Sequence, residues 1–350
     1  MAAALCLPRL GGMKYALQSR RGFLAGAAAA IATPALAQGN SWATVTDKAR
    51  SLSQCHAMMI RQSGTDVVRE VFRGPALGQA VPVKSVSKSV VAALTGAAID
   101  RGEIPDVDAT IAELAPALIP RAADARVGEI TVADLVTMQA GLERTSGANY
   151  GGWVSSANWV ADALSRPFVA EPGARMLYST GSFHVLGAVL SEVAGQSLLS
   201  LARTRLGEPL GIDIPAWTRD PQGRYLGGNE MSLSLEGMIR FGELYRQNGA
   251  YGGAQVLSAD WVAQSLLPRT RSAFSGLNYG YGWFLGRGGG ADYALARGYG
   301  GQVICVAPAL ELTLAITSDP TQPARSGGYF GDLQRLIEQD ILPLAAAQLG

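Results

Sequence analysis

The alternation of hydrophobic and polar positions in the first third of the chain predicts two strands followed by a helix. The runs from His56 to Gly64 and from Asp66 to Phe72 look like strands, and the Ser-Gly-Thr sequence at 63–65 between them is typical of a hairpin turn. A loop then leads to a long apolar segment that begins at Ser85 and ends at Gly102. Its apolar residues recur with helical spacing, so we expect a helix there.

The middle of the chain carries mostly helical patterns. Thr131 and Asp134 form a capping-box-like start to one helix. Residues 142–158, which include Tyr150 and Trp153, are rich in Gly, Ser and Asn and predict a long surface loop. The helices expected between residues 106 and 266 cover Ile111–Leu118, Thr131–Gln139, Trp159–Ser165, Phe183–Ala194, Ser197–Leu206, Ser234–Asn248 and Ser258–Leu266.

The last third returns to strand patterns. Tyr279, Tyr281 and Trp283 occupy alternate positions and predict one strand. A closing amphipathic helix is expected from Tyr329 to Leu342, with Pro343 as its stop. Three further antiparallel strands are expected at Tyr293–Ala296, Val303–Pro308 and Leu312–Ser318.

Strands at both ends with helices between them indicate an α+β fold. We expect one antiparallel sheet built from both chain ends, flanked by helices, with a mostly helical subdomain inserted in the middle. The α/β part is predicted at about 45–105 and 212–350 and the helical part at about 106–211, within one domain spanning 38–350.

Residues 1–37 have the pattern of a twin-arginine export signal. The segment at 19–24 reads Ser-Arg-Arg-Gly-Phe-Leu, an apolar run follows, and Ala35-Leu36-Ala37 suits a cleavage site. The run is short for a membrane anchor, although an uncleaved anchor is the alternative. Met13 is a second candidate start. We expect a periplasmic or secreted protein without stable membrane association after cleavage.

Composition narrows the function classes. Without residues 1–37 the chain keeps 25 basic and 28 acidic residues, a net charge of −3, and no basic patch indicates a nucleic-acid partner. The apolar content of 48% suits a globular enzyme. An oxidising compartment permits a disulfide between Cys55 and Cys305, but each lies in an apolar strand-like segment, which favours two buried thiols.

The scarcity of histidine excludes two common hydrolase types. Only His56 and His184 are present, whereas a catalytic zinc site usually needs three protein ligands, mostly histidine. We therefore expect no metal. Neither histidine accompanies a Gly-x-Ser-x-Gly elbow, so a Ser-His-Asp triad is hard to build. A hydrolytic serine in this chain would need a lysine or a tyrosine to move its proton.

The Ser85-Val86-Ser87-Lys88 segment supplies that combination. A spacing of three places hydroxyl and amine on one helix face, and a buried neutral amine can activate the hydroxyl as a nucleophile. With 25 serines and four lysines in the chain, chance would produce about 0.3 such pairs. The lysine must be desolvated, because an exposed lysine with a pKa of about 10.4 is charged at neutral pH. The alternative is an N-cap serine beside a solvated lysine.

Four blocks in order strengthen this interpretation: residues 83–89, residues 130–142, Tyr178-Ser179-Thr180 running into Leu186-Gly187, and residues 297–302. Over residues 45–345 they resemble the penicillin-recognising serine hydrolases of the class C β-lactamase-like branch. That branch includes esterases, D-amino-acid peptidases and amidases such as 6-aminohexanoate-dimer hydrolase. The resemblance implies a β-lactamase/transpeptidase-like fold without a cofactor, with Ser85 as the acylated nucleophile and Lys88 as the group that accepts its proton.

The second motif of the family, Tyr-x-Asn, corresponds to Tyr178-Ser179-Thr180. The resemblance implies that Tyr178 lies between Ser85 and the leaving group, either sharing the base role as a phenol of depressed pKa or donating a proton. Thr180 can hydrogen-bond Lys88 but offers fewer hydrogen-bonding groups than asparagine. This difference affects contacts with the substrate side chain more than the catalytic steps. The alternative is a tyrosine packed before a helix.

The third motif, Lys-Thr-Gly or His-x-Gly, corresponds to Tyr299-Gly300-Gly301. No lysine follows Lys88, so the cation that holds a substrate carboxylate in true β-lactamases is missing. Arg297 could partly substitute, although its strand position would point it differently. The glycines would let a strand backbone approach the substrate, and a backbone N–H from this segment, with that of Ser85, would form an oxyanion hole. The alternative is a glycine-rich strand bend.

We therefore predict an exported serine hydrolase that acts on a small-molecule ester or amide through an acyl-enzyme. Ser85, Lys88 and Tyr178 are the expected catalytic residues. The expected substrate-binding residues are Thr180, Tyr299, Gly300, Gly301 and Gln302. Two alternatives remain: a true β-lactamase or D,D-peptidase, and a catalytically silent protein that keeps a penicillin-like pocket.

Overall fold

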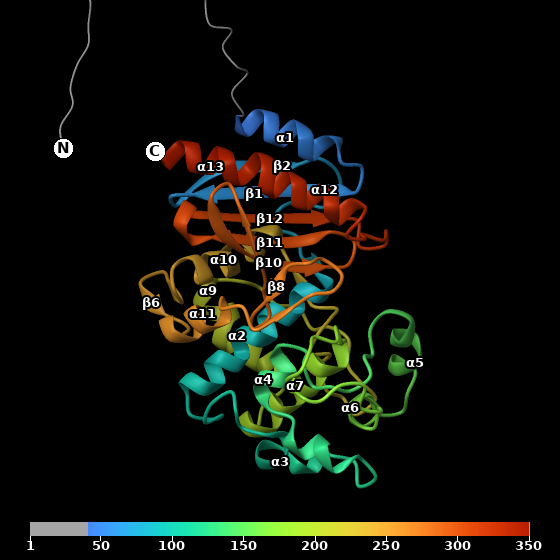
Figure 1. The fold of residues 1–350 in the computed structure, drawn as a ribbon. Helices are drawn as coiled ribbons and strands as arrows, with labels where there is room; N and C mark the ends of the chain where they lie inside the picture. The colour runs from blue at the N-terminus through green and yellow to red at the C-terminus, as the bar shows by residue number, and fades with distance from the viewer. Residues whose placement is uncertain (1–40, 350) are drawn as a thin grey trace, which may run out of the picture. The chain divides into compact units, whose positions relative to one another are not determined.

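The computed structural model describes residues 41–349, so the expected export signal lies outside the described residues. An antiparallel sheet in the order β2-β1-β12-β11-β10-β9-β8-β7 forms one half of this part (Figure 1). Pairing of β1 with β12 joins the N-terminal hairpin to the C-terminal strands, which confirms the sheet built from both chain ends. The strands are β1 (Cys55–Gln62), β2 (Thr65–Val71), β7 (Thr270–Arg271), β8 (Asn278–Tyr279), β9 (Phe284–Gly288), β10 (Ala291–Gly298), β11 (Gln302–Ala307) and β12 (Leu312–Ser318).

Helices cover both faces of the sheet. Helices α1 (Trp42–Ser51), α12 (Tyr329–Arg335) and α13 (Leu342–Leu349) lie on one face, and α10 (Leu235–Arg246) and α2 (Ser87–Asp100) on the other (Figure 1). The predicted α+β fold is confirmed.

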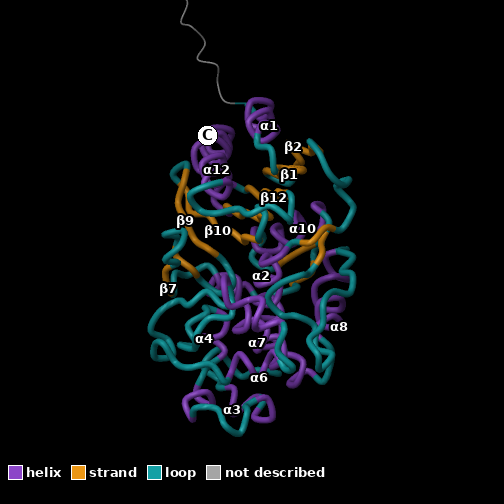
Figure 2. The backbone as a smooth tube through the Cα atoms, turned by 90° about the vertical axis from the view of Figure 1, so that its right-hand side faces the viewer, coloured by secondary structure: helices purple, strands orange, loops and turns teal. Residues whose placement is uncertain are grey.

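The remaining helices pack mostly beyond α2, away from the sheet, and α2 and α7 lie at the centre of the view in Figure 2. They are α3 (Ile111–Leu114), α4 (Val132–Val136), α5 (Tyr150–Val154), α6 (Trp159–Leu164), α7 (Thr180–Ala194), α8 (Leu198–Ala202), α9 (Glu208–Leu210) and α11 (Ala259–Ser265). Two short strand pairs lie outside the large sheet: β3 (Val81–Pro82) with β4 (Ser232–Leu233), and β5 (Ala250–Tyr251) with β6 (Ala254–Gln255).

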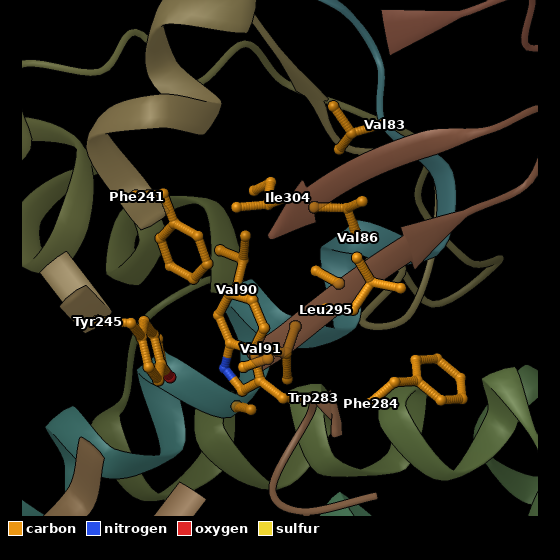
Figure 3. Packing of buried hydrophobic residues seen from close by; sticks show 14 of the residues in the cluster. Val83, Val86, Val90, Val91, Phe241, Tyr245, Trp283, Phe284, Leu295 and Ile304 are labelled. Atoms are coloured by element: carbon orange, nitrogen blue, oxygen red, sulfur yellow. The ribbon is translucent and has the colours of Figure 1, made fainter. Parts of the chain in front are cut away.

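Helix α2 is buried around its whole circumference, from Ser87 to Ala98. The sequence predicted one apolar side, but α2 lies between the sheet and α7 and therefore needs apolar or small residues on every side. Near its start, side chains from α2 pack with Phe241 and Tyr245 of α10 and with Trp283 (Figure 3). The residues at the head of this helix thus rest on a close-packed core.

The Tyr279–Trp283 segment is not the single strand that its alternation predicted. The chain bends between β8 and β9, where Gly282 has a φ of 79°. A Cβ on Gly282 would lie 2.5 Å from the Cβ of Ala92, so α2 forces the chain to turn here. All three aromatic residues of the segment are buried, as the alternation required, but in a bend.

The C-terminal helix does not stop at Pro343. It passes through a π-helical stretch at Leu336–Ile341 and continues as α13. Proline is tolerated at this point because the regular i→i−4 hydrogen-bond ladder is already interrupted just before it.

The expected surface loop at 142–158 is more ordered than predicted. It contains α5, and Trp153 is fully buried, with its ring centroid 5.5 Å from that of Trp159 and 5.7 Å from that of His184. Sequence composition marked the segment as irregular, whereas the tryptophans anchor it. Cys55 and Cys305 are both buried free thiols, as favoured.

Two further properties of residues 41–349 concern membranes and metal ions. No single helix there has the length and apolar character to cross a membrane, although the bent pair Thr180–Ala194 and Leu198–Leu210 passes that test jointly. Within the same range no group of three or more His, Cys, Asp or Glu side chains is arranged to hold a metal ion.

Candidate active site

Ser85 lies in a tight turn just before α2. A 3-10 turn at Lys84–Val86 leads into the helix, and Lys84 has a left-handed backbone with a φ of 53°, a conformation that costs energy for a residue with a side chain. The Ser87 hydroxyl holds the turn by donating to the Lys84 carbonyl at 2.5 Å and accepting from the Met231 N–H at 3.2 Å. The Ser85 side chain is thereby fixed at the cavity wall.

The Lys88 amine has three polar neighbours within hydrogen-bond distance. They are Ser85 Oγ at 3.1 Å, Thr180 Oγ1 at 3.3 Å and the Gly228 carbonyl at 2.7 Å. The residue is 2% exposed, and burial lowers its pKa from 10.5 to about 7 because a desolvated ammonium is disfavoured.

A neutral amine suits these partners. It has two N–H donors and one lone pair, and a carbonyl can only accept a hydrogen bond. When Gly228 and Thr180 accept the two hydrogens, the lone pair of the neutral amine is free for the Ser85 hydroxyl, 3.1 Å away. Lys88 is therefore placed to accept a proton from Ser85.

Tyr178, just before α7, lies beside both Lys88 and Ser85. The amine is 5.0 Å from the centre of its ring, and Phe284 stacks on the ring at 6.5 Å. Burial raises the pKa of Tyr178, although a hydrogen bond with Ser85 and the charge of Arg297 act in the opposite direction. The expected phenol of depressed pKa is therefore wrong, and the second expectation, a neutral phenol that donates a proton, fits the structure.

Thr180 is the first residue of α7 and is buried beside Lys88. Its hydroxyl lies 3.0 Å from Ser146 Oγ, and its backbone N–H donates to that same oxygen at 2.8 Å. Thr180 thus links Lys88 to the 142–158 segment. Sequence reasoning missed Ser146, because nothing in its local pattern distinguishes it from the other polar residues of that segment.

A pair of glycines, Gly227 and Gly228, supplies the carbonyl that holds Lys88. A Cβ on Gly227 would lie 2.1 Å from the Phe183 carbonyl oxygen, so the glycine is needed for the segment to lie flat on α7. The Gly227 N–H donates to His184 Nδ1 at 3.4 Å, while His184 Nε2 lies 3.1 Å from Asp220 Oδ2. Sequence reasoning assigned no chemistry to this segment, and the glycine pair was its only signal.

The Tyr299-Gly300-Gly301 segment is a turn between β10 and β11 instead of a strand. A Cβ on Gly300 would lie 2.3 Å from the Asp319 carbonyl, and one on Gly301 would lie 2.4 Å from the Tyr329 ring. Neither glycine is among the residues that line the cavity, and a substrate contact through their backbone stays a prediction.

Gln302 and Tyr299, the two other expected substrate contacts in this region, differ in whether they line the cavity. Gln302 is fully buried, and its side chain exchanges two hydrogen bonds with the backbone of Ser318, at 2.7 and 3.2 Å. It therefore holds β11 to β12 and does not line the cavity. Tyr299 is half-exposed and does line it.

A cavity of about 530 Å³ opens beside Ser85, Tyr178 and Thr180. Tyr150, Phe274, Phe284, Tyr299 and Phe330 form the aromatic part of its wall. Its charged groups are the ion pair of Lys84 with Glu230, at 3.1 Å, and Arg297. The cavity combines an apolar wall with a few polar groups, as small-molecule sites do.

The model of the Beta-lactamase family matches residues 55–338. The chain belongs to the β-lactamase family. No curated protein sequence matches it.

Solved structures show the same fold at low sequence identity. A provisionally named 6-aminohexanoate-dimer hydrolase from Bacillus anthracis is 17% identical with a TM-score of 0.69, covering 85% of this chain and 80% of that one. EstCE1, a hydrolase with promiscuous acyltransferase activity, is 17% identical with a TM-score of 0.68, covering 86% and 98%. A family VIII carboxylesterase is also 17% identical, with a TM-score of 0.66 and coverage of 87% and 96%. These similarities establish the β-lactamase/transpeptidase-like fold of this family member.

Proposed function

We propose that this β-lactamase-family protein is a serine hydrolase that cleaves an ester or a small amide through an acyl-enzyme. The observation that carries the proposal is the buried Lys88 amine, 3.1 Å from Ser85 Oγ, with its pKa lowered to about 7. A base of that pKa is half-deprotonated near neutral pH, where general-base catalysis is most effective.

The first half-reaction forms the acyl-enzyme. The Ser85 proton passes to Lys88 while Oγ attacks the carbonyl carbon of the substrate. The bond to the leaving group then breaks, and the Tyr178 phenol donates a proton to the departing oxygen or nitrogen. The Lys88 ammonium returns its proton to the phenolate, which restores both groups.

The second half-reaction releases the acid. Water replaces the leaving group, gives a proton to Lys88 and adds to the acyl carbon. The bond from Ser85 Oγ to the acyl carbon breaks, Oγ takes the proton back from Lys88, and the carboxylic acid leaves. In this scheme Ser85, Lys88 and Tyr178 carry out the first half, and Ser85 and Lys88 carry out the second, without a metal or an organic cofactor.

An ester or linear amide is favoured over a β-lactam because the third motif lacks its lysine. The carboxylesterase and the acyltransferase-active hydrolase among the similar structures support this choice by analogy. We place the reaction in the periplasm or outside the cell, on the basis of the export pattern at residues 1–37.

The test combines covalent labelling with turnover of p-nitrophenyl esters, nitrocefin and a linear amide dimer. We expect a fluorophosphonate probe to label Ser85, as seen by peptide mass spectrometry, and ester hydrolysis to disappear in Ser85→Ala. Ser155→Ala, a change at an exposed serine, is the matched control. An unlabelled Ser85 with no turnover would support the catalytically silent alternative. Nitrocefin hydrolysis at rates like those of the esters would support a β-lactamase.

A further inference from the structure

Arg297 is the penultimate residue of β10. It is a cation in the cavity wall without an acidic partner. Across residues 41–349 no carboxylate lies within 4.0 Å of its guanidinium, and its one side-chain hydrogen bond, to Ser326 Oγ, is long at 3.4 Å. The two other charges of the cavity, Lys84 and Glu230, neutralise each other. The cavity therefore carries an uncompensated positive charge that comes from Arg297.

Aromatic stacking fixes this guanidinium without using its hydrogen-bond donors. The Cζ atom lies 4.0 Å from the centre of the Phe330 ring and 5.4 Å from that of Phe284. Contact with a ring uses none of the N–H donors of a guanidinium. Apart from the long bond to Ser326, the donors of Arg297 are left for a planar anion.

Burial makes the missing partner costly. Desolvation lowers the pKa of Arg297 to about 10, which still leaves it protonated at neutral pH. A partly buried cation without a partner is unfavourable, and an anionic ligand would recover much of that cost. The stacking rings alone do not supply the missing negative charge.

Arg297 is also close to the reacting groups. Phe284 stacks on Tyr178 and contacts Arg297, and the charge of Arg297 acts on the pKa of Tyr178. Because Arg297 and Ser85 line the same cavity, an anion held by the guanidinium would belong to a molecule bound in that cavity.

We propose that Arg297 binds a carboxylate of the substrate, so that the preferred substrates are anionic esters or amides. This inference rests on the proposed hydrolase function. Arg297 reaches the cavity from two residues before the third motif, so the site binds its anion from a different position than a lysine of that motif would occupy.

Matched substrates test the proposal. p-Nitrophenyl hemiglutarate carries a carboxylate on the acyl part and p-nitrophenyl butyrate does not. The butyrate ester of 4-hydroxybenzoate carries one on the leaving group and phenyl butyrate does not. We expect Arg297→Gln to lower kcat/KM at least tenfold for one anionic ester, mainly through KM, since the variant loses charge-assisted hydrogen bonds to the carboxylate. Neutral esters should change less than about threefold.

The controls separate recognition from packing. Arg297→Lys should retain part of the preference. Arg287→Gln, on the neighbouring strand β9 and outside the cavity, should leave it unchanged. Equal losses for anionic and neutral esters would assign Arg297 a packing role and overturn the proposal. If Arg297→Gln does not fold, the wild-type protein is tested by inhibition of neutral-ester turnover. Benzoate should then inhibit more strongly than benzamide, and equal inhibition by the two would overturn the proposal.

Binding measurements distinguish failure of the proposed hydrolysis from failure of the anion site. If no ester is turned over, calorimetric binding of p-nitrophenyl hemiglutarate to Ser85→Ala still decides the matter. If the double variant Ser85→Ala/Arg297→Gln binds this ester at least tenfold more weakly than Ser85→Ala, the anion site exists even without the reaction. Equal affinities of the two variants would contradict the anion site.

Discussion

At the scale of single residues, the site depends on the protonation state of Lys88. The amine is enclosed by Ser85, Thr180 and the Gly228 carbonyl, and no carboxylate within 4.0 Å, among the residues from 41 to 349, stabilises its charged form. Desolvation is the cause of the lowered pKa. The same burial that makes Lys88 a base at neutral pH also makes the site sensitive to pH.

The pH dependence of kcat/KM should report Lys88. Because the reactive form is the neutral amine and the pKa is lowered to about 7, kcat/KM should rise about tenfold per pH unit below 7 and level off above it. Burial raises the pKa of Tyr178, so the plateau should extend to about pH 10. Initial rates with a neutral ester from pH 5 to 10 measure this, and a profile that keeps rising to pH 10 would contradict a neutral Lys88.

Thr180 should matter through its hydroxyl. Thr180→Val removes an acceptor for a Lys88 hydrogen and a partner of Ser146, and leaving a buried donor unpaired costs about 1–3 kcal/mol. We expect kcat to fall roughly tenfold with little change in KM. Thr180→Ser, which keeps the hydroxyl, is the matched control, and equal losses in both variants would refute this role.

At the scale of elements, three segments distant in sequence meet at Lys88. Helix α2 carries the amine, α7 begins with Thr180, and the Gly227–Gly228 segment lies on the first turns of α7. His184 of α7 accepts a hydrogen bond from the Gly227 N–H and faces Asp220 with its other nitrogen. The carbonyl that orients Lys88 is therefore positioned by contacts between elements.

Gly227→Ala tests this arrangement. The added methyl would lie 2.1 Å from the Phe183 carbonyl oxygen, so the segment must move away from α7 and take the Gly228 carbonyl with it. We expect kcat for ester hydrolysis to fall at least tenfold and the pH midpoint of kcat/KM to shift. Gly152→Ala, where an added Cβ meets no atom within 4 Å, is the control. An unchanged pH midpoint in a folded Gly227→Ala variant would argue against positioning of Lys88.

At the scale of the whole molecule, the candidate active site reduces stability. Helix α2 is enclosed by the sheet on one side and α7 on the other, so Lys88 is desolvated at the centre of the fold. Lowering its pKa from 10.5 to about 7 corresponds to roughly 5 kcal/mol of unfavourable free energy at low pH. The folded state tolerates this cost because the surrounding core is extensive.

Lys88→Met should make the free energy of unfolding less dependent on pH. Between about pH 7 and 10.5 the unfolded chain binds a proton at Lys88 that the folded protein does not, so wild-type stability rises with pH. The advantage of Lys88→Met should be largest below pH 7 and shrink by about 1.4 kcal/mol per pH unit above it. Urea unfolding of both proteins at pH 7, 8 and 9 measures the difference, and a constant difference would mean that native Lys88 is charged.

Local patterns predicted the elements whose structure depends on nearby residues. The β1–β2 hairpin and the capping box of Thr131 and Asp134 form as expected, because turn residues and helix caps act over three or four positions. The Ser85 and Lys88 pair is juxtaposed for the same reason, since one helical turn separates them.

Long-range packing decided the rest. The bend at Gly282 and the burial of Trp153 depend on neighbours far along the chain. The same holds for Ser146 and Gly228, which contact Thr180 and Lys88 only after folding. The amino-acid sequence alone determined that Ser85 and Lys88 lie three residues apart where a helix begins. Only the tertiary structure removed water from the Lys88 amine and left Arg297 unpaired in the cavity, because desolvation and charge pairing depend on all atoms nearby and not on position in the chain.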